Sequence, residues 1–281
     1  MKKFLAGITL FIFFCLKFYS GISQTQTNSY PWIKSKNIQQ TIETRFPPPT
    51  GYERVKAPPG SFGDWLRGLP LLPDSTPVKE YRGRIMVQAN DTTLAAVVNY
   101  DIFNKKLEQC MDIIIRLRAE YLRFKNKKEI SFFLPVKFLL NWADWARGYR
   151  PVFQGINISL VQQEIPDSSR AAYEKYLREI FYYSGTQTAY FNYSKIEPGD
   201  VQIGDFIVKK GKKGHTILII DLVVNSQGEK MALIGHGDTP ACQFYVLNYR
   251  KGQPWFPLNV RVKRLPMPFK KKMYWDGLRR F

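Results

Sequence analysis

The stretch from Val201 to Leu247 constrains the fold of this chain more than any other part of the sequence. It contains three apolar, β-branched runs, which are GDFIVKK, HTILIIDLVV and KMALIGHG, with Gly, Asp and Asn residues between them. Runs of this composition, bounded by turn residues, are typical of strands that are buried on at least one face. We therefore expect three consecutive strands and an antiparallel core sheet within residues 201–262.

The two histidines of the chain both lie in this stretch. His215 begins the second predicted strand and His236 ends the third, so neighbouring strands would bring the two imidazoles close together. Imidazole is the side chain most often used as a general base near neutral pH. A sheet that holds both histidines therefore indicates a functional site.

The strongest helical periodicity covers residues 104–125. Its apolar positions recur at helical spacing and predict one buried face; they include Leu107, Cys110, Met111, Ile114, Leu117 and Tyr121. Cys110 has two readings, as a buried core thiol or as a nucleophile facing the sheet. The predicted boundaries place it well inside the helix, where the helix dipole favours a thiolate less than at the N-terminus.

The N-terminus resembles an export signal. Residues 1–23 contain Lys2 and Lys3, a short apolar run and then small residues, a pattern typical of a cleaved signal peptide. The alternative is an uncleaved N-terminal anchor. Cleavage would leave an exported protein, periplasmic or extracellular, without an integral membrane span.

The rest of the chain divides into two parts. Residues 24–50 are rich in Gln, Thr and Ser, and this composition predicts a flexible linker. Residues 51–281 are predicted to form a single α+β domain.

Export leaves two cysteines, Cys110 and Cys242. In an oxidising compartment the two thiols could pair, and pairing would exclude catalysis by Cys110. A second amphipathic helix is predicted at residues 168–184, between the predicted core helix and the core sheet. Asp205 and Asp221 are candidates to orient His215, although Gly-Asp before a strand is also a common turn signal.

The chain is basic, with a formal net charge of +19. The basic residues are scattered and accompany no zinc-finger spacing or recognition-helix pattern, so we expect no nucleic-acid partner. A solvated basic surface is one reading, and attraction to an anionic cell-wall or envelope polymer is the other. The histidines show no HxH or HExxH spacing, and we predict neither a metal site nor a cofactor.

Several of these segments carry a family resemblance. Gly204-Asp205-Phe206-Ile207, followed by Gly214-His215 and an aliphatic strand, resembles the NlpC/P60 and CHAP-like cysteine peptidases and amidases. The chain resembles still more closely an uncharacterised secreted bacterial family, domain of unknown function 4846. The segments that carry this second resemblance are Ser61-Phe62, Trp65-Leu66-Arg67, Gln109-Cys110, Arg116 to Leu122, Tyr183 to Thr186, Gly204-Asp205, Gly214-His215 and Pro240-Ala241.

The peptidase resemblance implies a papain-like core, in which a helix packs on an antiparallel sheet, with a helical insertion and an N-terminal extension. It implies that Cys110 is the nucleophile, His215 the general base and His236 the polar residue that orients His215. Two functions follow. The first is a secreted cysteine hydrolase that acts on an envelope or cell-wall amide bond. The second is a non-catalytic binding or structural envelope protein with the same fold.

Overall fold

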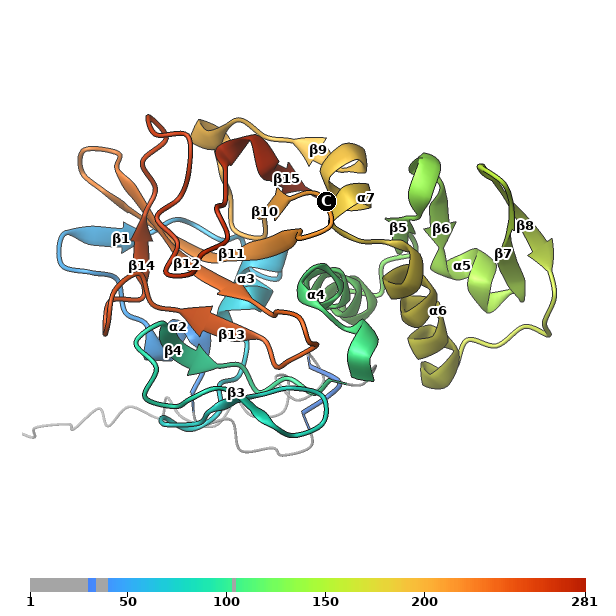
Figure 1. Ribbon diagram of the computed structural model, residues 1–281, viewed down its shortest axis with the longest axis horizontal. Helices are drawn as coiled ribbons and strands as arrows, with labels where there is room; N and C mark the ends of the chain where they lie inside the picture. The colour runs from blue at the N-terminus through green and yellow to red at the C-terminus, as the bar shows by residue number, and fades with distance from the viewer. Residues whose placement is uncertain (1–29, 34–39, 103–104) are drawn as a thin grey trace, which may run out of the picture.

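A computed structural model describes residues 30–33, 40–102 and 105–281. Its centre is an antiparallel sheet in which nine strands of the described chain take part (Figure 1). The main path runs β4 (Leu94–Val97), β13 (Tyr245–Leu247), β12 (Lys230–His236), β11 (His215–Asn225), β10 (Phe206–Lys209), β15 (Leu278–Arg280) and β9 (Ser194–Lys195). In addition, β1 (Tyr52–Arg54) pairs with β11, and β14 (Trp255–Pro257) pairs with β12. The molecule is therefore an α+β protein.

The three predicted strands are present as β10, β11 and β12, neighbours in the sheet and in the sequence. His215 is the first residue of β11 and His236 the last residue of β12. The sheet differs from the prediction at its ends. Residues 260–262 form no strand, and Val260 and Val262 are about half exposed, at 48% and 45%. The sheet also recruits strands from outside residues 201–262.

The central helix α4 (Cys110–Phe124) begins later than the predicted residue 104. Residues 105–107 form the single 3-10 turn η1 (Lys105–Leu107), and Gln109 has an extended backbone. The Asp112 carboxylate accepts a hydrogen bond from the Gln109 N–H at 3.0 Å, which fixes the start of the helix. The prediction for this boundary was wrong because the apolar spacing continues from α4 through the preceding turn.

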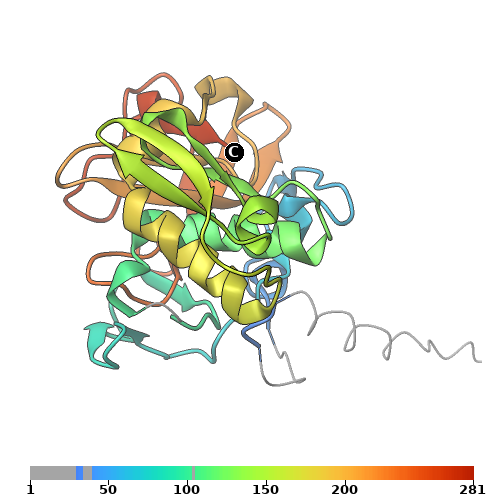
Figure 2. The ribbon, with the colours of Figure 1, turned by 90° about the vertical axis from the view of Figure 1, so that its right-hand side faces the viewer.

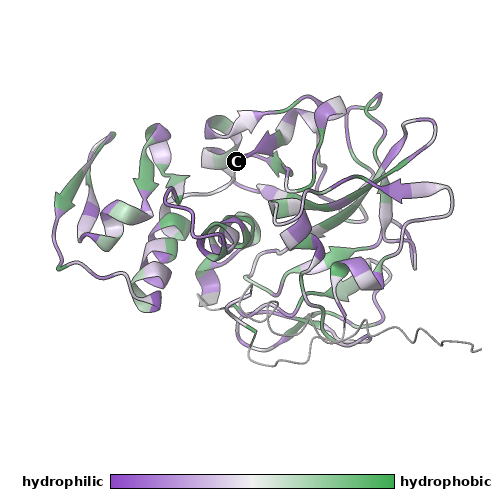
Figure 3. Ribbon diagram, turned by 180° about the vertical axis from the view of Figure 1, so that it is seen from behind, coloured by the Kyte–Doolittle hydropathy of each residue, from purple (hydrophilic) through white to green (hydrophobic). Residues whose placement is uncertain are grey.

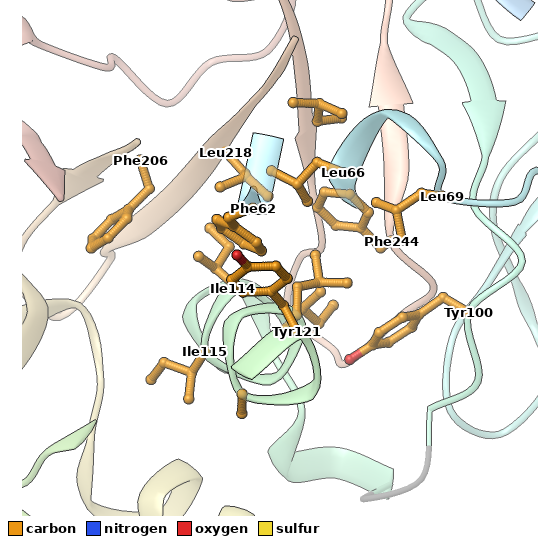
Figure 4. Close-up of a cluster of buried hydrophobic side chains, with 14 of the residues drawn as sticks. Phe62, Leu66, Leu69, Tyr100, Ile114, Ile115, Tyr121, Phe206, Leu218 and Phe244 are labelled. Atoms are coloured by element: carbon orange, nitrogen blue, oxygen red, sulfur yellow. The ribbon is translucent and has the colours of Figure 1, made fainter. Parts of the chain in front are cut away.

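Side chains from both faces of the sheet are buried. On one face, α4 and α3 (Phe62–Arg67) pack against the sheet through an apolar cluster that includes Phe62, Ile114, Leu218 and Phe244 (Figure 4). The opposite face carries a second cluster, which includes Ile217, Ile219 and Leu265. Figure 3 shows apolar stretches along the central strands. Alternate residues of β11 thus point to different cores, as the two-residue period of a strand requires.

Strands β2 (Val78–Lys79) and β3 (Ile85–Val87) form a small separate hairpin. Between α4 and β10, the predicted helical insertion also contains two hairpins, and it forms one side of the molecule (Figures 1 and 2). Its elements are β5 (Ser131–Phe133), η2 (Pro135–Lys137), β6 (Leu139–Asn141), α5 (Trp142–Ala146), β7 (Tyr149–Gln154), β8 (Asn157–Gln162), α6 (Arg170–Tyr183) and α7 (Thr186–Asn192). Two further 3-10 turns are η3 (Pro198–Asp200) and η4 (Trp275–Gly277).

Part of the predicted linker packs onto the domain. The Tyr30 hydroxyl donates to the Trp65 carbonyl at 2.7 Å, and the Trp32 indole donates to the Asn99 carbonyl at 2.7 Å. The short helix α2 (Ile42–Arg45) buries Ile42 completely. The burial of these aromatic and aliphatic side chains stabilises the segment. The polar composition of residues 24–50 gave no indication of this packing. The predicted signal peptide at residues 1–23 lies outside the described residues.

Within the described part of the chain, no helix is both long enough and apolar enough to cross a lipid bilayer.

Candidate active site

Cys110 is the first residue of α4 and is 7% exposed. The backbone amide of Thr216, the residue after His215, lies against the sulfur and lowers the pKa of the thiol. The N-terminus of a helix also favours a nearby negative charge. Cys110 therefore occupies a position on its helix that favours the thiolate more than the predicted interior position would.

Burial acts in the opposite direction, and its effect on the pKa of the Cys110 thiol is larger than the effects of the Thr216 amide and the helix N-terminus. Desolvation, followed by the nearby Asp112 carboxylate, raises the pKa of the Cys110 thiol to about 11. The positive charge of Lys271 lowers the pKa of the same thiol. At neutral pH the thiol is thus protonated in this conformation.

His215 and His236 are in direct contact. Nε2 of His215 lies 2.7 Å from Nδ1 of His236, and the rings meet edge to face, with 4.9 Å between centroids. Both side chains are 1% exposed. The sequence predicted this proximity from the positions of the two residues at adjoining strand ends, and the structure confirms it.

The charge of Lys271 defines the direction of the hydrogen bonds through the two rings. The Lys271 ammonium, 3.5 Å from Nδ1 of His215, can only donate, so this nitrogen is the acceptor. His215 then carries its proton on Nε2 and donates it to Nδ1 of His236. Nε2 of His236, which carries the remaining proton, has no hydrogen-bond partner among the described residues. In this tautomer the lone pair available for base chemistry is on Nδ1 of His215.

Both imidazoles are neutral at physiological pH. Desolvation, followed by the charge of Lys271, lowers the pKa of His215 to about 4. Desolvation and the neighbouring His215 hold the pKa of His236 well below its usual value. A neutral imidazole is the form that accepts a proton from a nucleophile.

The segment from Pro266 to Lys272 lies over the two rings. The Phe269 ring is nearly parallel to that of His236, at 24° and 5.3 Å, and meets His215 edge to face at the same distance. Lys271 donates to the Asp238 carboxylate at 2.6 Å. We call residues 266–272 the strap.

Asp238 is the carboxylate nearest to His215, with 3.8 Å between Oδ1 and Nδ1. The two carboxylates considered from the sequence have other partners. Asp205 accepts from Arg280 and from the Gln202 N–H. Asp221 binds the guanidinium groups of Arg54 and Arg67. Neither is therefore placed to orient His215.

The sequence analysis did not identify Asp238 as a partner of His215, and it did not assign Lys271, Phe269 or Thr216 to the site. One signal was available: Asp238 follows His236 by two residues. The lysine and the phenylalanine are remote from both histidines in the sequence and carry no local motif.

The structure brings Cys110 and the histidine pair into one region without hydrogen-bond contact. Among the described residues, no hydrogen bond links the sulfur to either imidazole. The charges of Lys271 and Asp238 act on the pKa of Cys110 and on that of His215, which indicates a shared electrostatic environment. Cys242 is a free thiol, as is Cys110, and its sulfur accepts from the Asp238 N–H at 3.2 Å.

The described residues contain no cluster of three or more His, Cys, Asp or Glu side chains that could hold a metal ion. The ammonium of Lys271 lies beside Nδ1 of His215, and its positive charge would repel a metal ion at this nitrogen.

Comparison with known proteins places the chain in a family. The model of a domain of unknown function (4846) matches residues 42–276, and the chain belongs to this family. No curated protein and no solved structure matches the chain.

Proposed function

We propose that this protein is an exported cysteine hydrolase that cleaves an amide bond in a cell-wall or envelope polymer, with a core related to the NlpC/P60 and CHAP-like enzymes. Cys110 is the nucleophile, His215 the general base and His236 the residue that orients His215. The observation that carries the proposal is the hydrogen-bonded pair His215–His236 next to a thiol at the first position of a helix. The signal peptide predicted at residues 1–23 supports the location.

The reaction proceeds in two steps. Nδ1 of His215 accepts the Cys110 proton, and the thiolate attacks the amide carbonyl carbon. The amine leaves with the proton from His215, which gives a thioester on Cys110. Water, deprotonated by the same nitrogen, then attacks the thioester and releases the carboxylic acid and the free thiol.

The resting geometry requires a rearrangement before the first step. Burial keeps the thiol protonated, and Lys271 occupies the space beside Nδ1 of His215. Displacement of the strap would remove the Phe269 ring and the Lys271 ammonium from His215 and leave Nδ1 open to the thiol and to a substrate. Substrate-induced displacement of such a segment is common in enzymes that exclude water from the reacting groups.

The second candidate function is a non-catalytic envelope binding or structural protein. The burial of Cys110, at 7% exposure with a pKa raised to about 11, favours this alternative. A core thiol of this kind would be inert toward reagents.

Alkylation of the folded protein with iodoacetamide, followed by mass spectrometry, separates the two functions. For a hydrolase we expect Cys110 to react faster than Cys242, which serves as an internal control with its own pKa raised to about 12. His215→Gln should slow the labelling of Cys110 alone, and Phe269→Ala should accelerate it. Equal, slow labelling of both cysteines in all three proteins, with normal folding of Cys110→Ala, would exclude the hydrolase.

A further inference from the structure

Two hollows are lined mainly by cations and apolar side chains, and neither includes His215 or His236 in its lining. One encloses about 460 Å³ and is lined by Lys209, Lys210, Arg261 and Lys263 among others. The second encloses about 610 Å³, and its charged lining consists of Arg264, Lys270, Lys271 and Lys272. Val262 lines both, so the two hollows lie on either side of the segment that carries this residue. We call the surface formed by these eight basic residues the cationic groove.

The groove has almost no internal counter-charge. Among the described residues, Lys271 is the one groove cation with an ion-pair partner, Asp238. Asp276 is the one carboxylate in the lining of these two hollows, and it already contacts Lys195 at 3.4 Å and the Tyr190 hydroxyl. The groove therefore has a strong positive potential, which an anionic ligand would neutralise.

The segment between the two hollows is held in place. Arg264 pairs with Tyr274 in an antiparallel bridge, and the Trp275 N–H donates to the Lys263 carbonyl at 3.2 Å. The shape of the groove thus does not depend on a free loop. Apolar surface lies between the cations, since Val260 and Val262 are about half exposed and Tyr274 is 43% exposed.

The second hollow borders the candidate active site, because Phe269 and Lys271 line it and both contact His215. Lys209 on β10 is the register partner of His215 on β11, and Lys271 contacts His215 directly. A chain lying in the second hollow would therefore pass over the strap.

We propose that the cationic groove binds an acidic peptide, whose carboxylates contact the lysines and arginines and whose backbone amide is presented to Cys110. The choice of a peptide rests on the proposed function, because amide hydrolysis requires an amide. The alternation of cations with apolar surface matches a chain whose carboxylates are separated by apolar methylene and backbone groups. The groove thus gathers part of the excess positive charge of the chain at one place on the surface.

Binding can be tested without catalysis, using the full chain with Cys110→Ala and a fluorescein-labelled oligoglutamate peptide monitored by fluorescence anisotropy. The groove variant Lys210→Gln, Lys263→Gln, Lys270→Gln should weaken binding about tenfold, because it removes three solvent-exposed charge contacts, each of which contributes modestly. The control variant Lys125→Gln, Lys127→Gln, Lys128→Gln removes the same charge from exposed lysines at the C-terminal end of α4 and beyond it. It should change the affinity less than twofold. Thermal melts of both variants check folding.

Equal weakening by the two triple variants would overturn the proposal, because it would indicate a diffuse field. Groove-dependent binding of dextran sulfate without binding of oligoglutamate would also overturn it, in favour of an acidic glycan. The assay does not depend on Cys110. An unreactive Cys110 together with groove-dependent peptide binding would therefore exclude the hydrolase and leave the acidic peptide site intact.

Discussion

The ammonium of Lys271 lies 3.5 Å from Nδ1 of His215 and at the same time donates to the Asp238 carboxylate at 2.6 Å. A cation thus contacts the nitrogen of His215 that is not bonded to His236. Burial and, after it, the charge of Lys271 lower the pKa of His215 and keep the imidazole neutral, and the contact determines which nitrogen carries the proton. It also links the strap directly to the proposed general base.

Lys271→Met should raise the pKa of His215. The substitution removes a positive charge beside the ring and releases the Asp238 carboxylate, and both changes favour the imidazolium form, by about one pK unit together. An NMR titration of the imidazole protons can measure this pKa, because the chain contains two histidines. Lys272→Met, at an exposed neighbouring position, is the matched control. An unchanged His215 pKa in Lys271→Met would contradict the contact.

The stability of the protein should decrease between pH 6.5 and about pH 4. Folding lowers the pKa of His215 from 6.5 to about 4, so in this range the unfolded state binds a proton that the folded state does not. Stability therefore falls with falling pH, by up to about 3 kcal/mol at about 1.4 kcal/mol for each pK unit. His236, with a pKa lowered in the same direction, adds to the effect.

Urea denaturation at a series of pH values measures this dependence. In the double variant His215→Asn, His236→Asn, the curve of unfolding free energy against pH should be flatter over the same range. Other buried acids contribute equally to both proteins and cancel in the difference. Parallel curves for the double variant and the natural chain would show that the histidines are not the cause.

Gly214→Ala should displace His215. A Cβ at this position would lie 2.1 Å from the Thr186 hydroxyl and 2.9 Å from two backbone carbonyl oxygens. The start of β11 would have to move, and we expect a loss of about 2 kcal/mol in stability and a changed NMR shift of the His215 ring. Gly199→Ala, where a Cβ meets nothing within 4 Å, is the control. Unchanged stability and an unchanged His215 signal in Gly214→Ala would refute the close approach.

Asp221→Asn should destabilise the protein by about 3 kcal/mol. The Asp221 side chain is fully buried and binds Arg54 and Arg67, so the substitution leaves two partly buried guanidinium groups without their counter-charge. Asp144→Asn, which loses the more exposed ion pair with Arg147, should cost less than about 1 kcal/mol. Chemical denaturation of both variants checks the difference, and similar losses would indicate that the buried pair contributes little.

Strands β10, β11 and β12 were predictable from the sequence because their signals are local. Alternating or continuous β-branched runs bounded by turn residues specify a strand without reference to the rest of the chain. The position of His215 at a strand start and of His236 at a strand end follows from the same pattern, and so does the meeting of the two rings. The helical insertion between α4 and β10 was implied by the family resemblance and not by a local signal of this kind.

Only the tertiary structure decided what surrounds the two rings. Lys271 is separated from His215 by 56 residues, and no periodicity relates the two positions. Helix α4 starts at Cys110 because the carboxylate of Asp112 accepts a hydrogen bond from the Gln109 N–H. The apolar pattern continues upstream of this point and therefore did not reveal the boundary. The spacing of hydrophobic residues indicates which face of a helix or strand is buried. The choice of partner on that face depends on how distant segments pack, and this is settled only when the whole chain folds.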